Sequence, residues 1–377
     1  TLRPAPAGPP VGGDDADVYG RDPCEPEGGR ERGGDEEGCG GVITMGYHNG
    51  LPHSPALTFL CDTASNEKQA YTEKDRFVEP TNYKYYVEFV TAVKSISKDV
   101  LIYTDLKTFT DELPNHPDRP VLSTWFGGQS RNRRSMVPAI CEASRVPYVG
   151  ADAYANLLCA DKYWALEFAR HKGLKTPSHR LIWSPEDIGS VETLPLPQVI
   201  KPLAEGSSIG ILQTNLVKNY MDAPQCAERL LQDMNSPIVA EEFIPGREVS
   251  VVLIGKPDDI QIFECMELIV SGDETYLYDK IWDIELKKNS EKPQLSRCIS
   301  SEFPKSEWSK IRKLYNSLGK MDYMRVDGRL NLNGFVVGEL SPDAHLGSDN
   351  ALAQAAACQG YGYNQFFRLL YSLASPH

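Results

Sequence analysis

The chain carries the stretch MRVDGRLNLNGFVVGELSP at residues 324–342, and its alternating apolar and polar residues are typical of two β-strands joined by an Asn-Gly turn. We expect a three-residue loop over 332–334, with Gly334 in the left-handed conformation. Phe335 then faces Asn331 across the hairpin. The loop length matters because side chains alternate between the two faces of a strand, so a shift of one residue moves each of them to the other face.

This register brings four polar side chains to one face of the hairpin. Asp327 lies opposite Glu339, and Arg325 lies opposite Ser341. Two facing carboxylates repel each other unless a cation lies between them, so the pairing predicts a site for Mg²⁺ or a similar hard ion with oxygen ligands. A two-residue turn would instead put the two acids on opposite faces, and acids on a hairpin are more often simply exposed to solvent.

A second segment that carries chemistry is KPLAEGSSIG at residues 201–210, directly after the apolar run PQVI. A lysine at a strand end followed by a Gly/Ser turn offers a cation, two hydroxyls and several backbone N–H groups to an anion such as a phosphate. The alternative is a flexible hairpin tip with a solvated lysine. The segment is not a Walker A loop, because GxxxxGK[ST] is absent.

A third segment, EEFIPGREVSVVLIG at residues 241–255, has acidic residues on both sides of a hydrophobic turn between two predicted strands. Strand ends of this kind present backbone donors and acceptors to a purine edge, and a carboxylate such as Glu248 accepts hydrogen bonds from ribose hydroxyls. Taken alone, the segment is equally compatible with surface acids on a hairpin.

The remaining chain predicts an α/β fold, because apolar runs alternate with helical patterns from residue 42 onward. Helices are expected over 83–97 and 161–172. The expected strands are GVITMGY (41–47), ALTFLC (56–61), VLIYT (100–104), VLSTWF (121–126), PQVIKP (197–202), GILQT (210–214), PIVAEEFI (237–244), EVSVVLIG (248–255) and IQIFECMELIV (260–270).

Composition narrows the class of protein. The 377 residues carry a formal net charge of −13, which argues against nucleic acid or an anionic membrane surface as a partner. No apolar run approaches the roughly 18 residues needed to span a bilayer. The nine cysteines form no CxxC pair, and with no secretory signal in front of them they favour a reduced, cytoplasmic location. Residues 1–41 carry ten acidic and four basic side chains, and we expect a disordered acidic Gly/Pro-rich tail there.

Taken together and in this order, the three segments resemble the nucleotide and metal sites of the ATP-grasp superfamily, and within it the chain resembles D-alanine:D-alanine ligases. The resemblance covers most of residues 146–370 and begins at VPYVGADAYANLLCADKYWALEFARHKGLKTP. It implies an ATP-grasp fold with an amino-terminal α/β (pre-ATP-grasp) domain. The implied division is the tail at 1–41, an amino-terminal substrate domain at 42–150, a central ATP-grasp subdomain at 151–237 and a carboxy-terminal subdomain with the metal site at 238–377.

The resemblance also implies a reaction and a set of site residues. A carboxylate would be phosphorylated by ATP to an acyl phosphate, and an amine would then attack to give an amide, ADP and phosphate. By position, Lys162 and Lys201 would contact the ATP phosphates, and Ser207 and Ser208 would belong to the flap over them. Glu241, Phe243 and Ile244 would border adenine, and Glu248 would take the ribose. Asp327, Glu339 and Ser341 would hold one or two Mg²⁺ ions, with Mn²⁺ as an alternative, and Arg325 would stabilise the transferred phosphoryl group.

Three positions depart from the family pattern. Ser341 stands where the family's metal motif has asparagine, and His345 stands where an oxyanion hole is built. We expect His345 to donate to an oxyanion or to contact substrate, with a structural histidine as the alternative. Lys280 lies in a loop, YLYDKIWD, that only loosely matches the family's lysine-bearing loop, and a phosphate contact is the role the match implies for it.

Arg133 and Arg134 fall where the resembling ligases have an acidic pair of the substrate region, and Arg131 lies beside them. The simple alternative is a solvated basic turn before a helix that starts near Pro138. We expect instead that at least one of these arginines, Arg133 above all, reaches the cleft and pairs with the carboxylate of a substrate that bears an extra acid group.

The leading hypothesis is an ATP-dependent ligase that forms C–N bonds between an acid and an amino acid in specialised metabolism. The alternatives are an authentic D-alanine:D-alanine ligase and a non-catalytic ATP-binding protein on the same scaffold. The expected partners are ATP, Mg²⁺ and small carboxylate and amine substrates, with no nucleic acid and no membrane. A homodimer is compatible with this reading, and the identity of both substrates stays open.

Overall fold

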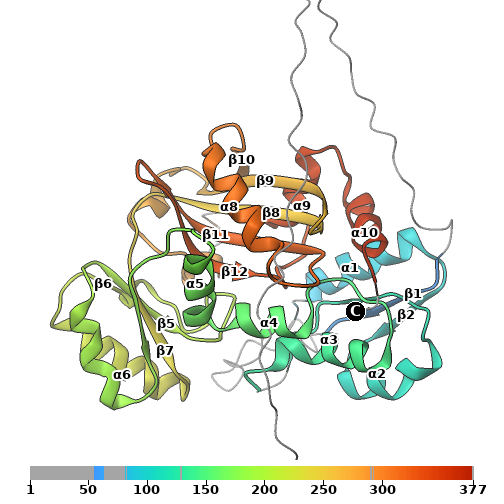
Figure 1. Ribbon diagram of the computed structural model, residues 1–377, viewed down its shortest axis with the longest axis horizontal. Coiled ribbons are helices and arrows are strands. Elements are labelled where there is room, and N and C mark those ends of the chain that lie inside the picture. The colour runs from blue at the N-terminus through green and yellow to red at the C-terminus, as the bar shows by residue number, and fades with distance from the viewer. Residues whose placement is uncertain are drawn as a thin grey trace, which may run out of the picture. The chain divides into compact units, whose positions relative to one another are not determined.

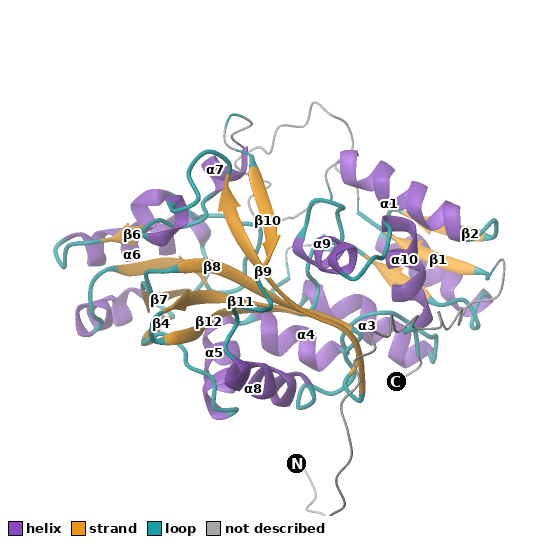
Figure 2. Cartoon of the chain, turned by 90° about the horizontal axis from the view of Figure 1, so that it is seen from above, coloured by secondary structure: helices purple, strands orange, loops and turns teal. Residues whose placement is uncertain are grey.

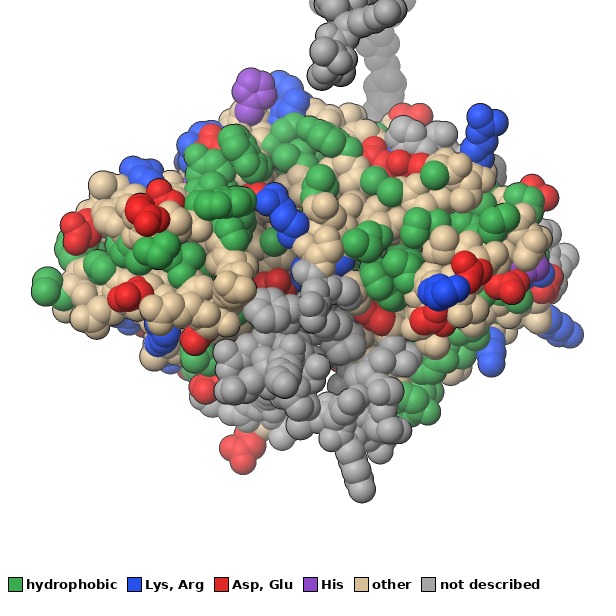
Figure 3. Space-filling model, turned by 90° about the horizontal axis from the view of Figure 1, so that it is seen from below, with side chains coloured by type: hydrophobic (Ala, Val, Ile, Leu, Met, Phe, Trp, Pro, Cys, Tyr) green, Lys and Arg blue, Asp and Glu red, His purple; other side chains and the backbone are tan. Residues whose placement is uncertain are grey.

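The computed structural model describes residues 55–62, 81, 83–127, 130–288, 291 and 293–375 (Figure 1). The expected tail at 1–41 and the expected strand at 41–47 lie outside the described residues. In the described part of the chain, no helix has the length and apolar character needed to cross a membrane. On the face drawn in Figure 3, the basic side chains of the described residues are scattered among acidic and apolar ones.

The first sheet is parallel and has the strand order β2-β1-β3. Every residue of β1 is buried, as expected for a strand that has helices on both faces of its sheet. Helix α10 packs against α1 on this sheet, so the last helix of the described chain belongs with it (Figures 1 and 2). We call this sheet and the helices around it the first module. The elements are β1 (Leu57–Leu60), α1 (Tyr83–Ile96), β2 (Val100–Tyr103), α2 (Leu106–Glu112), η2 (Leu113–Asn115), β3 (Val121–Ser123), α3 (Arg133–Ser144) and α10 (Tyr363–Ser372).

The second sheet is antiparallel, with the order β4-β7-β5-β6, and α6 packs on it. The strand expected at 210–214 is wrong. Asn215 accepts from the Leu212 N–H at 3.2 Å and donates to the carbonyl oxygen of Ile200 at 2.8 Å, so its side chain takes backbone partners that a longer strand would use. The elements are β4 (His179–Ile182), η3 (Pro185–Thr193), β5 (Gln198–Pro202), η4 (Gln213–Asn215), β6 (Leu216–Val217), α6 (Asp222–Met234) and β7 (Ile238–Glu242).

The third sheet is antiparallel, with the order β10-β9-β8-β11-β12. Alternate residues of β8 pack on α4, α5 and α8 on one face, and the residues between them pack towards α9 on the other. The elements are α4 (Ala153–Ala160), α5 (Lys162–His171), β8 (Arg247–Lys256), β9 (Asp259–Val270), η5 (Tyr276–Tyr278), α7 (Ile284–Lys288), β10 (Gln294–Cys298), α8 (Lys305–Tyr315), β11 (Tyr323–Asn331), β12 (Gly334–Ser341) and α9 (Ala351–Cys358).

The hairpin of β11 and β12 has a shorter loop than the sequence predicts. Asn331 pairs directly with Gly334, which leaves a two-residue loop, and Leu330 rather than Asn331 faces Phe335. The expectation of a three-residue loop is therefore wrong. Gly334 does have a positive φ of 102°. A two-residue loop alone would put the two acids on opposite faces of the hairpin.

A β-bulge restores the predicted pairing of the acids. Gly328 pairs with Val337, whereas the preceding Asp327 pairs with Glu339, so Gly338 is an extra residue on β12. Beyond the bulge, Arg325 faces Ser341 as predicted. The register around the acids is thus confirmed, although a bulge and not the loop length produces it.

The bulge depends on glycine at position 328. A Cβ atom there would lie 2.2 Å from the backbone oxygen of Val336 and 2.7 Å from the ring of Phe335. At Gly338 the nearest atom to a Cβ would be 3.8 Å away, which is ordinary contact. The two glycines of the bulge therefore differ sharply in how much they tolerate a side chain.

Gly328→Ala should lower the free energy of unfolding by about 2 to 4 kcal/mol, because the added methyl group displaces backbone in the core. Gly338→Ala is the matched control and should change it by less than about 1 kcal/mol. Urea unfolding of both variants measures the difference. Equal destabilisation by the two substitutions would contradict the close approach at Gly328.

Candidate active site

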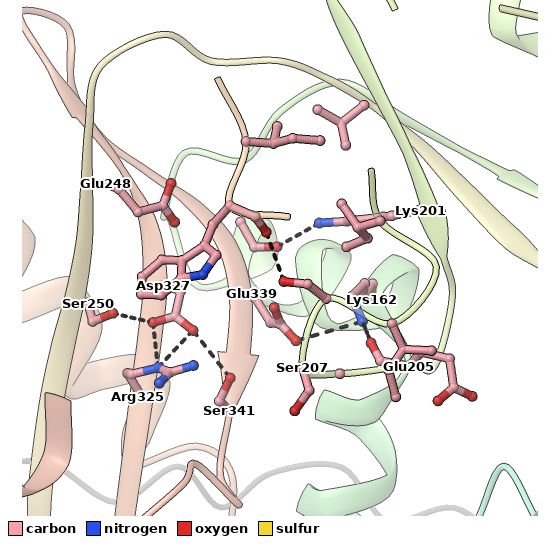
Figure 4. A pocket seen from close by; sticks show the side chains of 18 of the residues that line it. Lys162, Lys201, Glu205, Ser207, Glu248, Ser250, Arg325, Asp327, Glu339 and Ser341 are labelled. Atoms are coloured by element: carbon pink, nitrogen blue, oxygen red, sulfur yellow. Dashed lines mark hydrogen bonds and ion pairs between the residues drawn. The ribbon is translucent and has the colours of Figure 1, made fainter. Parts of the chain in front are cut away.

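A pocket of about 990 Å³ has walls from β5, β7, β8, β11 and β12 and from the first module, which contributes Tyr85, Phe126 and Arg134. Most of the predicted site residues line it, and Figure 4 shows the part around the predicted metal acids. Those that line it are Lys162, Lys201, Ser207, Ser208, Glu241, Phe243, Ile244, Glu248, Arg325, Asp327, Glu339, Ser341 and His345.

Lys201 lies near the end of β5, where the alternation of the strand turns its side chain towards the pocket. Its Nζ is 2.9 Å from Glu241 Oε2 on the neighbouring strand β7. Burial acts to lower the pKa of the Lys201 ammonium, but the carboxylates of Glu241 and Glu339 outweigh it and raise the pKa. The other oxygen of Glu241, Oε1, is buried without a hydrogen-bond partner, so an acceptor is left for a ligand.

Lys162 is the first residue of α5, directly after the N-cap Asp161. Its Nζ donates to the backbone oxygen of Glu205 and lies 3.7 Å from Glu339 Oε1. The side chain is 5% exposed, so its charge is held inside the pocket wall. A lysine at a helix N-terminus adds its charge to the partial positive charge of the helix end, which favours an anion.

The Gly/Ser segment after β5 has a backbone suited to anions. Ser207 and Ser208 have positive φ values of 50° and 60°, which cost about 1 kcal/mol each in non-glycine residues. Ser207 and Ser208 are the central residues of a turn in which the Ile209 N–H donates to the Gly206 oxygen at 2.9 Å, and successive backbone N–H groups in turns form concave sites for anions. Ser208 Oγ donates to the backbone oxygen of Trp282 at 2.8 Å, which ties this flap to the segment before α7. We refer to residues 205–210 as the flap.

The bulged hairpin brings together oxygen-bearing side chains and the guanidinium group of Arg325. Asp327 accepts hydrogen bonds from Ser250 Oγ at 2.6 Å and from Ser341 Oγ at 3.3 Å, and its Oδ1 lies 2.7 Å from Arg325 Nε (Figure 4). Burial raises the pKa of Asp327 despite the nearby Arg325. Burial also acts to raise the pKa of Glu339, but Lys162 and Lys201 outweigh it and lower the pKa of that carboxyl.

The donor set fits a hard cation that is shared with a ligand. Two carboxylates and a hydroxyl lie on the hairpin face, and Mg²⁺ is typically bound by one or two carboxylates together with water and phosphate oxygens. Among the described residues, no group of three or more His, Cys, Asp and Glu side chains forms a complete metal cage. The arrangement therefore suits an ion that arrives with an anionic ligand.

Glu248 and Phe243 lie on the wall formed by β8 and the turn before it. The Arg329 guanidinium is 2.7 Å from Glu248 Oε2, and it also lies 5.1 Å from the centre of the Phe243 ring. Burial raises the pKa of Glu248, although Arg329 opposes the shift. The wall thus offers an apolar ring beside a carboxylate acceptor.

His345 lies on the segment after β12, at the end of the pocket near the first module. Its Nδ1 accepts from the Gly347 N–H at 3.1 Å, so the proton of the neutral ring is assigned to Nε2. The ring packs edge-on against Tyr85 at 4.4 Å. Burial lowers the pKa of His345 to about 4, so the side chain is neutral at physiological pH.

The structure does not bring Lys280 and Arg133 to the pocket. The Lys280 ammonium lies 4.0 Å from the centre of the Tyr276 ring. Arg133 is 2% exposed, and its Nη2 is 2.8 Å from Glu205 Oε2. These placements give no support to the expected phosphate contact of Lys280 or to a substrate contact of Arg133.

Sequence reasoning did not assign Ser250 or Asp343, which line the pocket, and within the basic cluster it favoured Arg133 over Arg134. Ser250 had a usable signal, because it lies two residues after Glu248 on one strand and therefore on the same face. Arg134 lines the pocket in place of its neighbour and forms an ion pair with Asp343. That pair joins segments 209 positions apart, which no local pattern reveals.

Comparison with known proteins gives distant relatives. Vancomycin B-type resistance protein VanB of Enterococcus faecalis is 26% identical over 205 residues, which span 53% of this chain and 57% of VanB. A D-alanine–D-alanine ligase of Carboxydothermus hydrogenoformans is 27% identical over 236 residues, or 60% of this chain and 72% of that protein.

Solved structures share the fold. D-alanine–D-alanine ligase from Bacillus anthracis matches with a TM-score of 0.65 and 17% identity, over 85% of this chain and 97% of that one. VanG D-Ala:D-Ser ligase from Enterococcus faecalis matches with a TM-score of 0.60 and 18% identity, over 85% and 99%. These matches confirm the mixed α/β fold that the sequence predicts.

The model of the family described as D-ala D-ala ligase C-terminus matches residues 177–371, which is more than half of the chain and includes Lys201, the flap and the bulged hairpin. The protein therefore belongs to the D-Ala-D-Ala ligase C-terminal family, whose fold is the ATP-grasp fold.

Proposed function

We propose that this protein is an ATP-dependent, ADP-forming ligase that joins a small carboxylic acid to an amine through an acyl phosphate. The observation that carries the proposal is the convergence of Lys162, Lys201 and the flap on the same pocket as Asp327 and Glu339. Phosphoryl transfer needs cations and N–H donors around the phosphates and a hard metal ion at the transferring group. This pocket combines the cations and N–H donors with carboxylates of the kind that hold such a metal ion.

ATP is the proposed nucleotide. Lys162, Lys201 and the flap N–H groups would bind its phosphates. The adenine would lie beside Phe243 and Ile244, where the buried Glu241 Oε1 would accept from its amino group. Glu248 would accept from the ribose hydroxyls.

Asp327, Glu339 and Ser341 would hold Mg²⁺, which neutralises charge on the transferring phosphoryl group when bound. Arg325 would stabilise the same group from the facing position on the hairpin. The substrate carboxylate attacks the γ-phosphorus, so that a P–O bond forms to the acid and the bond to ADP breaks. The amine then attacks the acyl carbon, a C–N bond forms, and phosphate leaves while the amine loses a proton.

His345 would act in the second half of the reaction. Its Nε2–H is the donor of a neutral ring that Gly347 and Tyr85 hold in place. A fixed neutral donor stabilises an oxyanion that develops on the acyl carbonyl without adding a proton to the incoming amine. The amine must be unprotonated to attack, so a neutral donor suits this step.

The proposed substrates are small acids and amines of specialised metabolism, other than two D-alanine molecules. The second candidate is a D-alanine–D-alanine ligase, which the names of the relatives favour. Against it stand Ser341 and His345, which replace family residues, and Arg134, whose cation lies 5.6 Å from the centre of the Phe126 ring at the substrate end of the pocket. We also propose domain boundaries near residues 150 and 237, with two elements crossing them: α10 packs on the first sheet, and β7 pairs with β4 and β5 of the second.

Screening pairs of amino acids and small carboxylic acids should identify a pair that stimulates ADP release in the presence of Mg²⁺, and a chelator should abolish the stimulation. A coupled assay of ADP measures the rate. Stimulation by D-alanine alone would favour the D-alanine ligase. A complete screen without stimulation, in a protein that binds ATP, would favour a non-catalytic role.

Lys201→Ala should lower kcat/KM for ATP about ten- to hundredfold, because it removes a charge-assisted contact to phosphate. Lys280→Ala is the matched control outside the pocket and should stay within about twofold of wild type. Steady-state kinetics at saturating acid and amine measure both. Near-normal turnover by Lys201→Ala would mean that this lysine only balances Glu241.

His345→Gln should flatten the loss of stability in acid. The folded protein holds the His345 pKa near 4, below the ordinary 6.5, so the unfolded chain binds more protons between these values. Wild-type stability therefore falls as the pH drops from 6.5 towards 4, and the variant lacks this contribution. Urea unfolding across this range measures it, and parallel curves for the two proteins would contradict a buried neutral imidazole.

A further inference from the structure

The basic cluster at the N-terminal end of α3 pairs with three acids that are far apart in the sequence. Arg131 lies 3.8 Å from Asp161, and Arg133 lies 2.8 Å from Glu205. Arg134 pairs with Asp343. We call Arg131, Arg133 and Arg134 the arginine clasp. The sequence is compatible with a solvated turn or a substrate contact for this cluster. In the structure, its arginines instead form ion pairs with acids outside the first module.

Each acid that pairs with the arginine clasp adjoins a different part of the proposed ATP site. Asp161 is the N-cap directly before Lys162. Glu205 begins the flap, and Asp343 follows the hairpin face that carries Ser341. The first module thus contacts the residue before Lys162, the first residue of the flap and a residue just after the bulged hairpin, through three neighbouring side chains.

The ion pair of Arg133 with Glu205 is the buried one of the three pairs. Their side chains are 2% and 8% exposed, so neither charge is compensated by water. Glu205 is also held through its backbone oxygen, which accepts from Lys162. The first residue of the flap is therefore fixed from two sides, by the first module through its side chain and by α5 through its backbone.

The flap needs such an anchor. Ser207 and Ser208 have conformations that non-glycine residues rarely adopt, and these persist only when surrounding contacts enforce them. On the far side of the flap, Ser208 is tied to Trp282. On the near side, Arg133 of the first module contacts Glu205.

We propose that Arg133 is a positioning residue that holds the flap in its anion-binding conformation through Glu205, so that the first module sets the affinity for nucleotide. The inference rests on the proposed function for the identity of that nucleotide. Because Arg133 does not touch the pocket, its loss should weaken ATP binding and leave the KM of the acid substrate nearly unchanged. A substrate contact would produce the reverse pattern.

The test compares Arg133→Met with Arg119→Met, which removes a pair of the same 2.8 Å length to Asp99 inside the first module. We expect the Kd for ATP, measured by calorimetry, to rise about tenfold or more in Arg133→Met and to stay within about twofold in the control. Hydrogen exchange at residues 205–210, measured without nucleotide, should become faster only in Arg133→Met.

Two further variants separate positioning from simple stability. Arg133→Lys keeps the charge and should recover part of the affinity, and it serves if Arg133→Met does not fold. The double variant Arg133→Met with Glu205→Met removes both buried charges, so it should regain thermal stability without regaining ATP affinity.

Unchanged flap exchange in Arg133→Met, or full ATP affinity in the double variant, would overturn the proposal. A rise in the KM of the acid substrate alone would overturn it as well. If the wild-type protein does not bind ATP, the proposed function fails, whereas the exchange experiment still decides whether Arg133 holds the flap.

Discussion

Asp327 and Glu339 lie side by side on adjacent strands at a pocket wall, and the repulsion between these two carboxylates must be balanced for the third sheet to form as it does. Arg325 forms an ion pair with Asp327 on the same strand, and the ammonium groups of Lys162 and Lys201 act on Glu339. The two acids respond in opposite directions, with the pKa of Asp327 raised and that of Glu339 lowered. One acid is therefore paired within its own hairpin, and the other depends on cations from two other segments.

This dependence links the sheets to one another. Lys162 is the first residue of α5 and Lys201 is the penultimate residue of β5, so both must be in place before Glu339 is compensated. Lys162 also bonds to the flap at Glu205, which in turn pairs with Arg133. A single chain of charges thus runs from the hairpin through the flap to the first module. Breaking such a chain in the middle leaves buried charges without partners, which is more costly than never having placed them there.

Local patterns in the sequence predict much of this arrangement, because strand alternation, the Gly/Ser turn and the paired acids are local signals. The bulge could not be predicted, since it depends on the close approach of Gly328 to Val336, a contact that periodicity does not encode. The predicted register was right while the predicted loop was wrong, because two one-residue differences cancel. The arginines could not be assigned, since their charge is visible in the sequence but their partners lie 72 and 209 positions away.

The last helix has a consequence for how the protein can be divided. Tyr371 donates to the backbone oxygen of Thr58 at 2.9 Å, and Ser375 bridges to Tyr148, so the first sheet is completed by the far end of the described chain. A recombinant fragment that stops near residue 150 would leave the apolar side of α1 uncovered. A circular permutant that joins α10 directly to the first strand would instead keep this core in one continuous piece and lower the average sequence separation of its contacts.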